Sequence, residues 1–335
     1  EKSNSVLQTE TSEIAQNTTL TRKQPLPIGI NYFWVSIVMK PKTSLFEKIS
    51  ATLTEALVNG SSVPVVGERA LRYLGLGVKQ GGDDNVMAYR IPAIAMTKKG
   101  TLIAVYDMRY NHSSDLQGKI DIGICRSTDK GETWGPNQIA LSMGEYGGLP
   151  HAQNGIGDPA ILIDNQTNTI WIAGLWTHGA GSMSTGGMAS GIEPDETGQF
   201  ILARSDDDGL TWSKPINITH QIKNPCWGRF FQGPGRGITM KDGTLVFPMQ
   251  YIDSLHVSNA GIIFSKDHGE TWQVTNVACP STTESQVAEI EPGVLMLNMR
   301  NEYGKYRSVS ITRDLGKTWT AHISDKNTLR EPVCN

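Results

Sequence analysis

Ser127-Thr-Asp-Lys-Gly-Glu-Thr-Trp134 is the first of four copies of one eight-residue pattern. The other copies share its Asp, Gly, Thr and Trp and occupy residues 205–212, 265–272 and 312–319. Each copy follows a short apolar segment, which predicts a hairpin turn in which the Asp accepts backbone hydrogen bonds and the Gly takes a positive φ. We interpret the tryptophans as turn staples that pack inward, because four equivalent turns on separate units cannot all line one sugar-binding pocket.

The spacing of the copies indicates the architecture. Successive copies start 78, 60 and 47 residues apart, which is the scale of a four-stranded propeller blade with loops of varying length. The 35 glycines, many of them at turns between short apolar segments, also favour an all-β protein. At about 40 to 60 residues per blade, residues 86–335 supply only four or five blades. An unclosed propeller exposes strand edges, so we expect Asn335 not to be the native end.

The first 85 residues lack the repeated pattern. Residues 31–40 and 45–54 are compatible with β-strands, and the second stretch is also compatible with a helix. We interpret residues 1–75 as part of a β-sandwich-like module, which could bind carbohydrate, and the Gly- and Asp-rich residues 76–85 as a linker.

Composition excludes several classes of function. The net charge is −3 and charged residues are interspersed, so no basic stripe favours nucleic acid, and no apolar run reaches the roughly 20 residues of a membrane-spanning helix. The four cysteines have neither zinc-site nor disulfide-scaffold spacing, and we interpret them as small hydrophobic residues. We expect no metal and no cofactor.

Tyr89-Arg90-Ile-Pro92, together with the repeated pattern, resembles the bacterial exo-α-sialidase (neuraminidase) family. The resemblance runs over residues 86–335 and implies a six-bladed β-propeller, here incomplete at its C-terminus. It also implies that Arg90 grips the carboxylate of sialic acid. The chemistry is reasonable, because a planar and permanently charged guanidinium binds a carboxylate through two parallel hydrogen bonds.

The same resemblance assigns roles to residues of the next segments. In the stretch 106–115 it implies that Arg109 is a pocket arginine and that Asp115 is the catalytic acid/base on a mobile loop. It further implies that Asp158 contacts the substrate and that Gln232, in a glycine-rich loop, contacts the glycan. Trp176 is equally compatible with a pocket wall and with the protein core.

Two later residues complete the expected site. The resemblance implies that Glu284 activates a tyrosine nucleophile and that Arg300 is the second arginine of a carboxylate-binding triad. The third arginine and the nucleophilic tyrosine are expected C-terminal to this sequence, since Tyr303 and Tyr306 do not lie in the matching context. The chain by itself is therefore expected to be inactive.

The function predicted is a retaining exo-α-sialidase that hydrolyses terminal sialic acids of glycoproteins, glycolipids or oligosaccharides. Its rivals are a catalytically silent, lectin-like propeller, a propeller enzyme acting on a neutral glycan, and a trans-sialidase. Retained Asp115 and Glu284 argue against the lectin, and Arg90 and Arg300 argue against a neutral substrate. We expect sialylated glycans as partners, and a periplasmic, secreted or cell-surface location.

Overall fold

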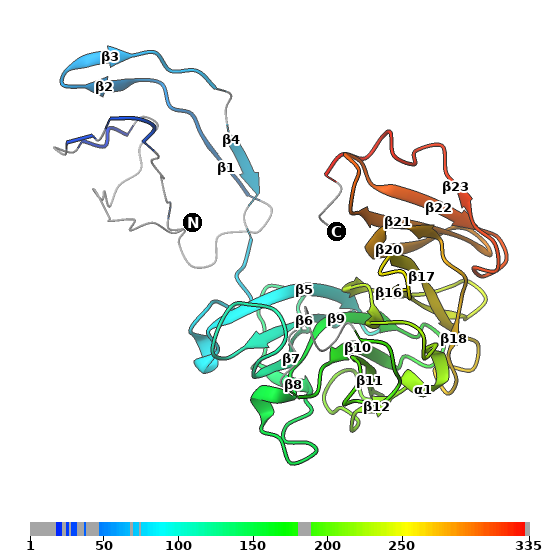
Figure 1. Cartoon of the computed structure of the whole chain (residues 1–335). Coiled ribbons are helices and arrows are strands. Elements are labelled where there is room, and N and C mark those ends of the chain that lie inside the picture. The colour runs from blue at the N-terminus through cyan, green and yellow to red at the C-terminus, as the bar shows by residue number, and fades with distance from the viewer. Residues whose placement is uncertain are drawn as a thin grey trace. The chain divides into compact units, whose positions relative to one another are not determined.

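Figure 1 shows the computed structural model of the chain, which divides into two compact units, Glu1–Gly75 and Leu76–Asn335. The structure describes the following residues: 18–21, 25–26, 28–31, 37, 47–67, 70–73, 75–179 and 189–331.

Among the described residues of the smaller unit, the strands form two antiparallel pairs. Strand β1 (Lys48–Ala51) pairs with β4 (Ala70–Tyr73), and β2 (Ala56–Val58) pairs with β3 (Ser61–Val63). The β2–β3 turn is Asn59-Gly60, where both residues have positive φ, as a two-residue hairpin requires. The strand expected within residues 45–54 is confirmed at β1, whereas most of residues 31–40 lies outside the described residues.

The larger unit is built from antiparallel sheets that follow one another along the chain (Figure 1). The first sheet, in spatial order, consists of β5 (Ala88–Met96), β6 (Leu102–Arg109), β7 (Ile120–Ser127) and β8 (Gln138–Leu141). The second consists of β9 (Ile156–Ile163), β10 (Ile170–Trp176), β11 (Gln199–Ser205) and β12 (Ile216–Asn217). Short helices η1 (Asp83–Asn85), η2 (His151–Gln153) and α1 (Thr219–Ile222) lie in the connections.

The third sheet has a broken first strand. Strands β13 (Phe230–Gln232) and β15 (Ile238–Thr239) both pair with β16 (Leu245–Ile252), while β14 (Gly235–Arg236) between them pairs in parallel with β9 of the second sheet. The sheet continues with β17 (Ser258–Ser265), against which β18 (Gln273–Val274) and β19 (Cys279–Pro280) pair. The fourth sheet consists of β20 (Thr282–Glu291), β21 (Val294–Asn301), β22 (Ser308–Thr312) and β23 (Thr320–Ala321).

Three apolar cores join neighbouring sheets. Ile122 of the first sheet and Ile172 of the second share one core, Trp171 and Phe247 join the second sheet to the third, and the third core extends to Leu297 of the fourth. These side chains are at most 2% exposed, and burial of each stabilises the fold by roughly 1.5–3 kcal/mol. Because the middle sheets are covered on both faces, β10 and β16 are buried along their whole lengths.

The four repeated octapeptides join the third strand of each sheet to the fourth, which confirms the hairpin prediction. In the first copy, the Asp129 carboxylate accepts hydrogen bonds from Ser127 Oγ, Thr133 N and Thr133 Oγ1, and the Gly131 N–H donates to Ser127 Oγ. The same arrangement recurs in the other copies. The Trp272 indole N–H donates 3.1 Å to the Gly269 carbonyl oxygen, which supports the staple interpretation.

The described cysteines differ in their exposure to solvent. Cys125 is fully buried, as expected of a small hydrophobic residue, but this expectation is wrong for Cys226, which is exposed in the loop before β13. Cys334 lies outside the described residues. Among the residues that the structure describes, no helix is long and apolar enough to cross a membrane.

Candidate active site

Strand direction brings the expected residues to one end of the sheets. Arg90, Asp158 and Glu284 lie near the starts of the first strands β5, β9 and β20. In an antiparallel sheet, the second strand ends where the first begins. Arg109 is accordingly the last residue of β6, and Arg300 is the last but one of β21. The third strand runs in the same direction as the first, so the octapeptide turns lie at the opposite end, away from this site.

A β-bulge interrupts each of these first strands at its functional residue. Two residues oppose one at Ile91-Pro92 in β5, at Asp158-Pro159 in β9 and at Thr283-Glu284 in β20. Ile91 and Asp158 have positive φ (52° and 56°), which is strained for a β-branched residue and for a residue that precedes proline. Bulges change the direction in which side chains point, and such strain is typical of functional sites.

Arg109 is the buried centre of the first cluster. Its Nε and one terminal nitrogen donate to Asp107 Oδ2 at 3.0 and 2.8 Å, and both side chains are only 1% exposed. Its other terminal nitrogen donates to Asp115 Oδ1 at 2.7 Å and to the Ser113 carbonyl oxygen at 2.9 Å. Burial raises the pKa of Asp107, and the nearby Asp158 carboxylate raises it further, whereas Arg109 opposes both effects.

Arg90 contacts the same loop from β5. One of its terminal nitrogens donates to Asp115 Oδ1 at 3.2 Å and to the Ser113 carbonyl oxygen at 3.0 Å. The side chains of Arg90 and Asp115 are 45% and 59% exposed, so a ligand can reach both. The structure therefore brings Arg90, Arg109 and Asp115 together, as the sequence predicted.

Asp158 is held through its backbone by two neighbouring sheets. Its N–H donates 2.9 Å to Asp107 Oδ1, and its carbonyl oxygen accepts from Gln232 Nε2. These bonds fix the left-handed conformation of Asp158. Burial raises the pKa of the Asp158 carboxyl to about 6, and the carboxylates of Asp115 and Glu284 add to this effect.

Glu284 and Arg300 form a second ion pair on the fourth sheet. Arg300 lies opposite the Thr283-Glu284 bulge and donates 3.0 Å to Glu284 Oε2. The side chain of Glu284 is 30% exposed and that of Arg300 is 37% exposed. Both therefore remain accessible while paired.

Two of the expected site residues are more buried than a ligand contact suggests. Gln232 is 0% exposed and its Nε2 is used by Asp158, so its observed role is to hold β9 rather than to face solvent. Trp176 is 1% exposed and packs edge-on against Tyr146, with ring centroids 4.8 Å apart. Of the two interpretations left open for Trp176, the structure favours the core.

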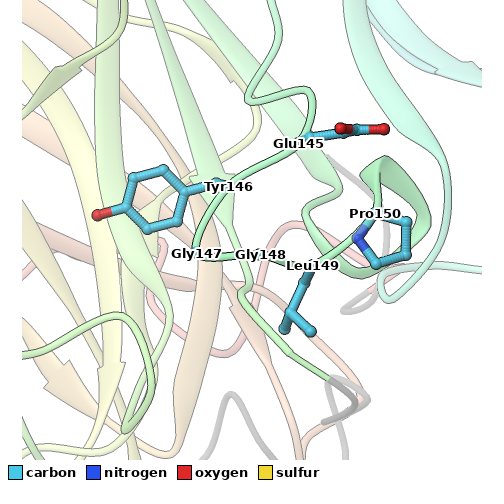
Figure 2. Close-up of a pocket in the computed structure, with 6 residues that line it drawn as sticks. All are labelled: Glu145, Tyr146, Gly147, Gly148, Leu149 and Pro150. Carbon is cyan, nitrogen blue, oxygen red and sulfur yellow. The ribbon is translucent and has the colours of Figure 1, made fainter.

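Figure 2 shows a surface hollow beside Tyr146, the residue that packs against Trp176. It occupies about 360 Å³ and is lined by residues 145–150 of the connection between the first two sheets. Tyr146 as a whole residue is 47% exposed. None of the eight expected site residues lines this hollow, so it is separate from the two ion-paired clusters.

Sequence reasoning missed Asp107 and Arg229. Successive side chains of a β-strand point to opposite faces, so Asp107 and Arg109, two residues apart in β6, lie on the same face. This spacing could have revealed their ion pair. Arg229 precedes β13, and its guanidinium lies 5.3 Å from the centre of the Phe231 ring. Burial lowers the pKa of Arg229, while Asp158 and Glu284 act to raise it, so a further cation adjoins the carboxylates. No simple local pattern marks this arginine.

Within the described residues, no group of three His, Cys, Asp or Glu side chains is arranged to hold a metal ion. The two clusters instead consist of carboxylates paired with guanidinium groups. In such a set the guanidinium groups can exchange an internal carboxylate for that of a negatively charged ligand. The carboxyl groups released in this way can then donate or accept protons.

Two protein-family models match the chain. Residues 91–331 match the model of a BNR repeat-like domain, and residues 1–62 match the N-terminal domain of BNR-repeat neuraminidase. The fold is therefore a BNR-repeat β-propeller, which confirms the all-β propeller class. The chain belongs to the BNR-repeat neuraminidase (sialidase) family, as its sequence motifs indicated.

Individual relatives carry the same name. The chain is 51% identical to a sialidase of Bacteroides fragilis over 98% of its own length, and 38% identical to a sialidase of Clostridium perfringens over 70%. It covers 61% of each of these relatives, so it spans about three fifths of their length.

Solved structures of sialidases are also similar to this chain. The Hadza microbial sialidase Hz136 matches with a TM-score of 0.81 and 57% identity, over 88% of this chain and 57% of that one. Trypanosoma rangeli sialidase in complex with the inhibitor DANA matches with a TM-score of 0.58 over 70% of this chain and 38% of that one. At 24% identity, this second likeness shows the fold alone.

Proposed function

We propose that the protein containing this chain is a retaining exo-α-sialidase that removes terminal sialic acids from glycoproteins, glycolipids or oligosaccharides. The observation that carries the proposal is a pair of accessible carboxylates at one end of the sheets, Asp115 paired with Arg90 and Arg109, and Glu284 paired with Arg300. Besides burial, both carboxylates raise the pKa of Asp158, so the two clusters lie close to it. The sialidases among its relatives support the same activity.

Arg90 and Arg300 bind the carboxylate of sialic acid in this proposal. Both side chains are more than a third exposed, and each now donates to an acidic residue of the protein. A substrate carboxylate offers a guanidinium two parallel charge-assisted hydrogen bonds, which are stronger than bonds to neutral partners. Binding thus exchanges an internal pairing for an external one and frees Asp115 and Glu284 to take part in proton transfer.

Asp115 acts as the general acid and then as the general base. It protonates the glycosidic oxygen as the bond to the leaving group breaks, and it later removes a proton from the water that releases sialic acid. Its 59% exposure, on a loop at the site end of β6, suits a group that meets both the leaving glycan and water. Arg109 holds the carboxylate from below through the 2.7 Å hydrogen bond.

Glu284 draws the proton from a tyrosine nucleophile. Sialidases use tyrosine where most retaining glycosidases use a carboxylate. A neutral phenol avoids the repulsion that a carboxylate would meet beside the substrate's own carboxylate. We place this tyrosine and the third arginine of the triad in sequence beyond this chain, and we count its four sheets as four blades of a six-bladed propeller.

The substrate class also suggests where the protein works. Sialylated glycans occur on secreted and cell-surface molecules, so we place the enzyme in the periplasm, at the cell surface or outside the cell. The N-terminal unit would be a β-sandwich-like module that precedes the propeller.

The test uses the full-length protein and the substrate 3′-sialyllactose. We expect hydrolysis with release of α-sialic acid as the first product, followed by NMR, and a fall in kcat/KM of about 10²–10⁴-fold for Asp115→Ala. Asp206→Ala is the matched control, because Asp206 is also 59% exposed and paired with an arginine, Arg204, yet lies in an octapeptide turn. A folded protein without hydrolysis, or equal activity of Asp115→Ala and Asp206→Ala, would contradict the proposal.

A further inference from the structure

We propose that Gln117 is a positioning residue, which fixes the loop that carries Asp115 against the second sheet. The inference rests on the proposed function, since it concerns the acid/base of that reaction. It starts from a contrast within the loop: Asp115 is mostly exposed, but the next two side chains are anchored.

The amide of Gln117 uses all its hydrogen-bonding capacity on backbone groups. Its Nε2 donates to the carbonyl oxygens of Thr177 at 2.8 Å and Gly179 at 3.0 Å. Its Oε1 accepts from the N–H groups of Gly118 and Gly155, both at 3.1 Å. Three of the four partners flank strands of the second sheet: Gly155 just before β9, and Thr177 and Gly179 just after β10. The Gln117 side chain therefore joins the first sheet's loop to the second sheet.

Close packing surrounds this bridge. Leu116 is buried in a small cluster with Ile120, Leu175 and Phe231, which come from three different sheets or their connections. A Cβ atom on Gly155 would lie 2.3 Å from the Gly118 carbonyl oxygen, so the two backbones approach as closely as glycine permits. The loop segment after Asp115 therefore has one apolar anchor and one polar anchor.

These two anchors affect catalysis because they set the distance from the Asp115 carboxyl to the leaving oxygen. A general acid must lie within hydrogen-bonding reach of the leaving oxygen, and a displacement of 1 Å can cost about 10²-fold in rate. Arg109 holds the Asp115 carboxylate and the Ser113 carbonyl oxygen on the first sheet, and it can keep both hydrogen bonds when Arg90 binds the substrate. Gln117 holds the other side of the loop on the second sheet. With both sides fixed, the exposed carboxylate keeps one position.

Replacement of Gln117 by Met keeps the length of the side chain and removes all four hydrogen bonds. If Gln117 positions the acid, the loss falls on substrates whose leaving group needs a proton. We expect kcat/KM of Gln117→Met in the full-length protein to fall about 10²-fold for 3′-sialyllactose. For 4-nitrophenyl α-sialoside, whose phenolate leaves without protonation, we expect a fall of less than about tenfold.

The matched control is Gln199→Met. Gln199 likewise donates through Nε2 to two carbonyl oxygens, those of Ile192 and Thr197. It lies opposite Trp176 in the β10–β11 pair, on the core side of the second sheet, and within the described part of the chain no hydrogen bond joins it to a charged site residue. We expect its substitution to change kcat/KM for both substrates by the same small factor. Circular dichroism and thermal unfolding report whether each variant is folded.

Gln117→Glu is the second variant, in case Gln117→Met does not fold. It keeps an acceptor for Gly118 and Gly155 and loses the donors to Thr177 and Gly179, so the same selective loss is expected. An equal loss on both substrates, or no loss, in a folded Gln117 variant would overturn the positioning role while the unsubstituted enzyme remains active. An unsubstituted protein that cleaves neither substrate would refute the proposed function itself.

Discussion

Substitution of Arg109 by Met tests whether the buried ion pair with Asp107 supports the whole site. Both side chains are 1% exposed, and two of the four hydrogen bonds from Arg109 go to Asp107 Oδ2. Met fills a similar volume, so packing changes little. The substitution instead leaves the Asp107 carboxylate buried without its cation.

Breaking a buried pair by removing one partner costs about 3–5 kcal/mol. We therefore expect Arg109→Met to lower the free energy of unfolding by about this amount at pH 9, where the Asp107 carboxyl of the unsubstituted protein is ionised. Without the guanidinium, the already raised pKa of Asp107 rises further, because Arg109 is the main group that lowers it. Protonation then relieves the buried charge. Because burial already raises the pKa of Asp107 to about 8, the loss of stability should be smaller at pH 7 than at pH 9.

Urea unfolding of the full-length protein, followed by circular dichroism, measures the effect. The double variant Asp107→Asn with Arg109→Met should recover at least half of the loss, since it removes the uncompensated charge. A loss below about 1 kcal/mol for Arg109→Met at pH 9, or a loss that grows as the pH falls from 9 to 7, would refute this reasoning.

Three further predictions concern single residues. Asp129→Asn should lower the thermal midpoint at pH 7, and the difference in midpoint from the unsubstituted protein should narrow as the pH falls below 4. The reason is that the Thr133 hydroxyl lowers the pKa of Asp129 to about 2, and the stability that the carboxylate contributes is lost on protonation. A difference in midpoint that stays constant from pH 7 to pH 3 would count against this. Asp158→Asn should gain about 2 kcal/mol of stability relative to the unsubstituted protein as the pH rises from 4.5 to 7, because the carboxyl whose pKa burial raises to about 6 must ionise in the folded state over this range. Urea midpoints at the two pH values measure this, and a difference independent of pH would contradict it. Trp176→Phe should lower the free energy of unfolding by about 1–3 kcal/mol and leave KM for 3′-sialyllactose within about twofold; a tenfold rise in KM would show that the indole contacts substrate after all.

The repeated octapeptide allowed the architecture to be predicted from sequence. A hairpin turn is a local structure, and the hydrogen bonds of Asp129 with Ser127 and Thr133 join residues at most four positions apart. Such contacts can be inferred from the order of residues alone. For the same reason recognisable local motifs led to the predicted arginines and acids of the site, whereas Asp107 was missed although it lies within one of those motifs, and Arg229 lies in none of them.

The sequence by itself determined the all-β propeller and the family. It also predicted the meeting of Arg90 and Arg109, on the paired strands β5 and β6, with Asp115 on the loop that follows β6. Only the tertiary structure showed how Asp158 and Asp115 are held. Gln232 reaches Asp158 from 74 positions away, and Gln117 reaches Thr177 and Gly179 from 60 and 62 positions away. The physical reason is that these bonds join different sheets, whose relative placement is set by the apolar cores between them. No local pattern records that placement, and it also decided that Trp176 belongs to the core.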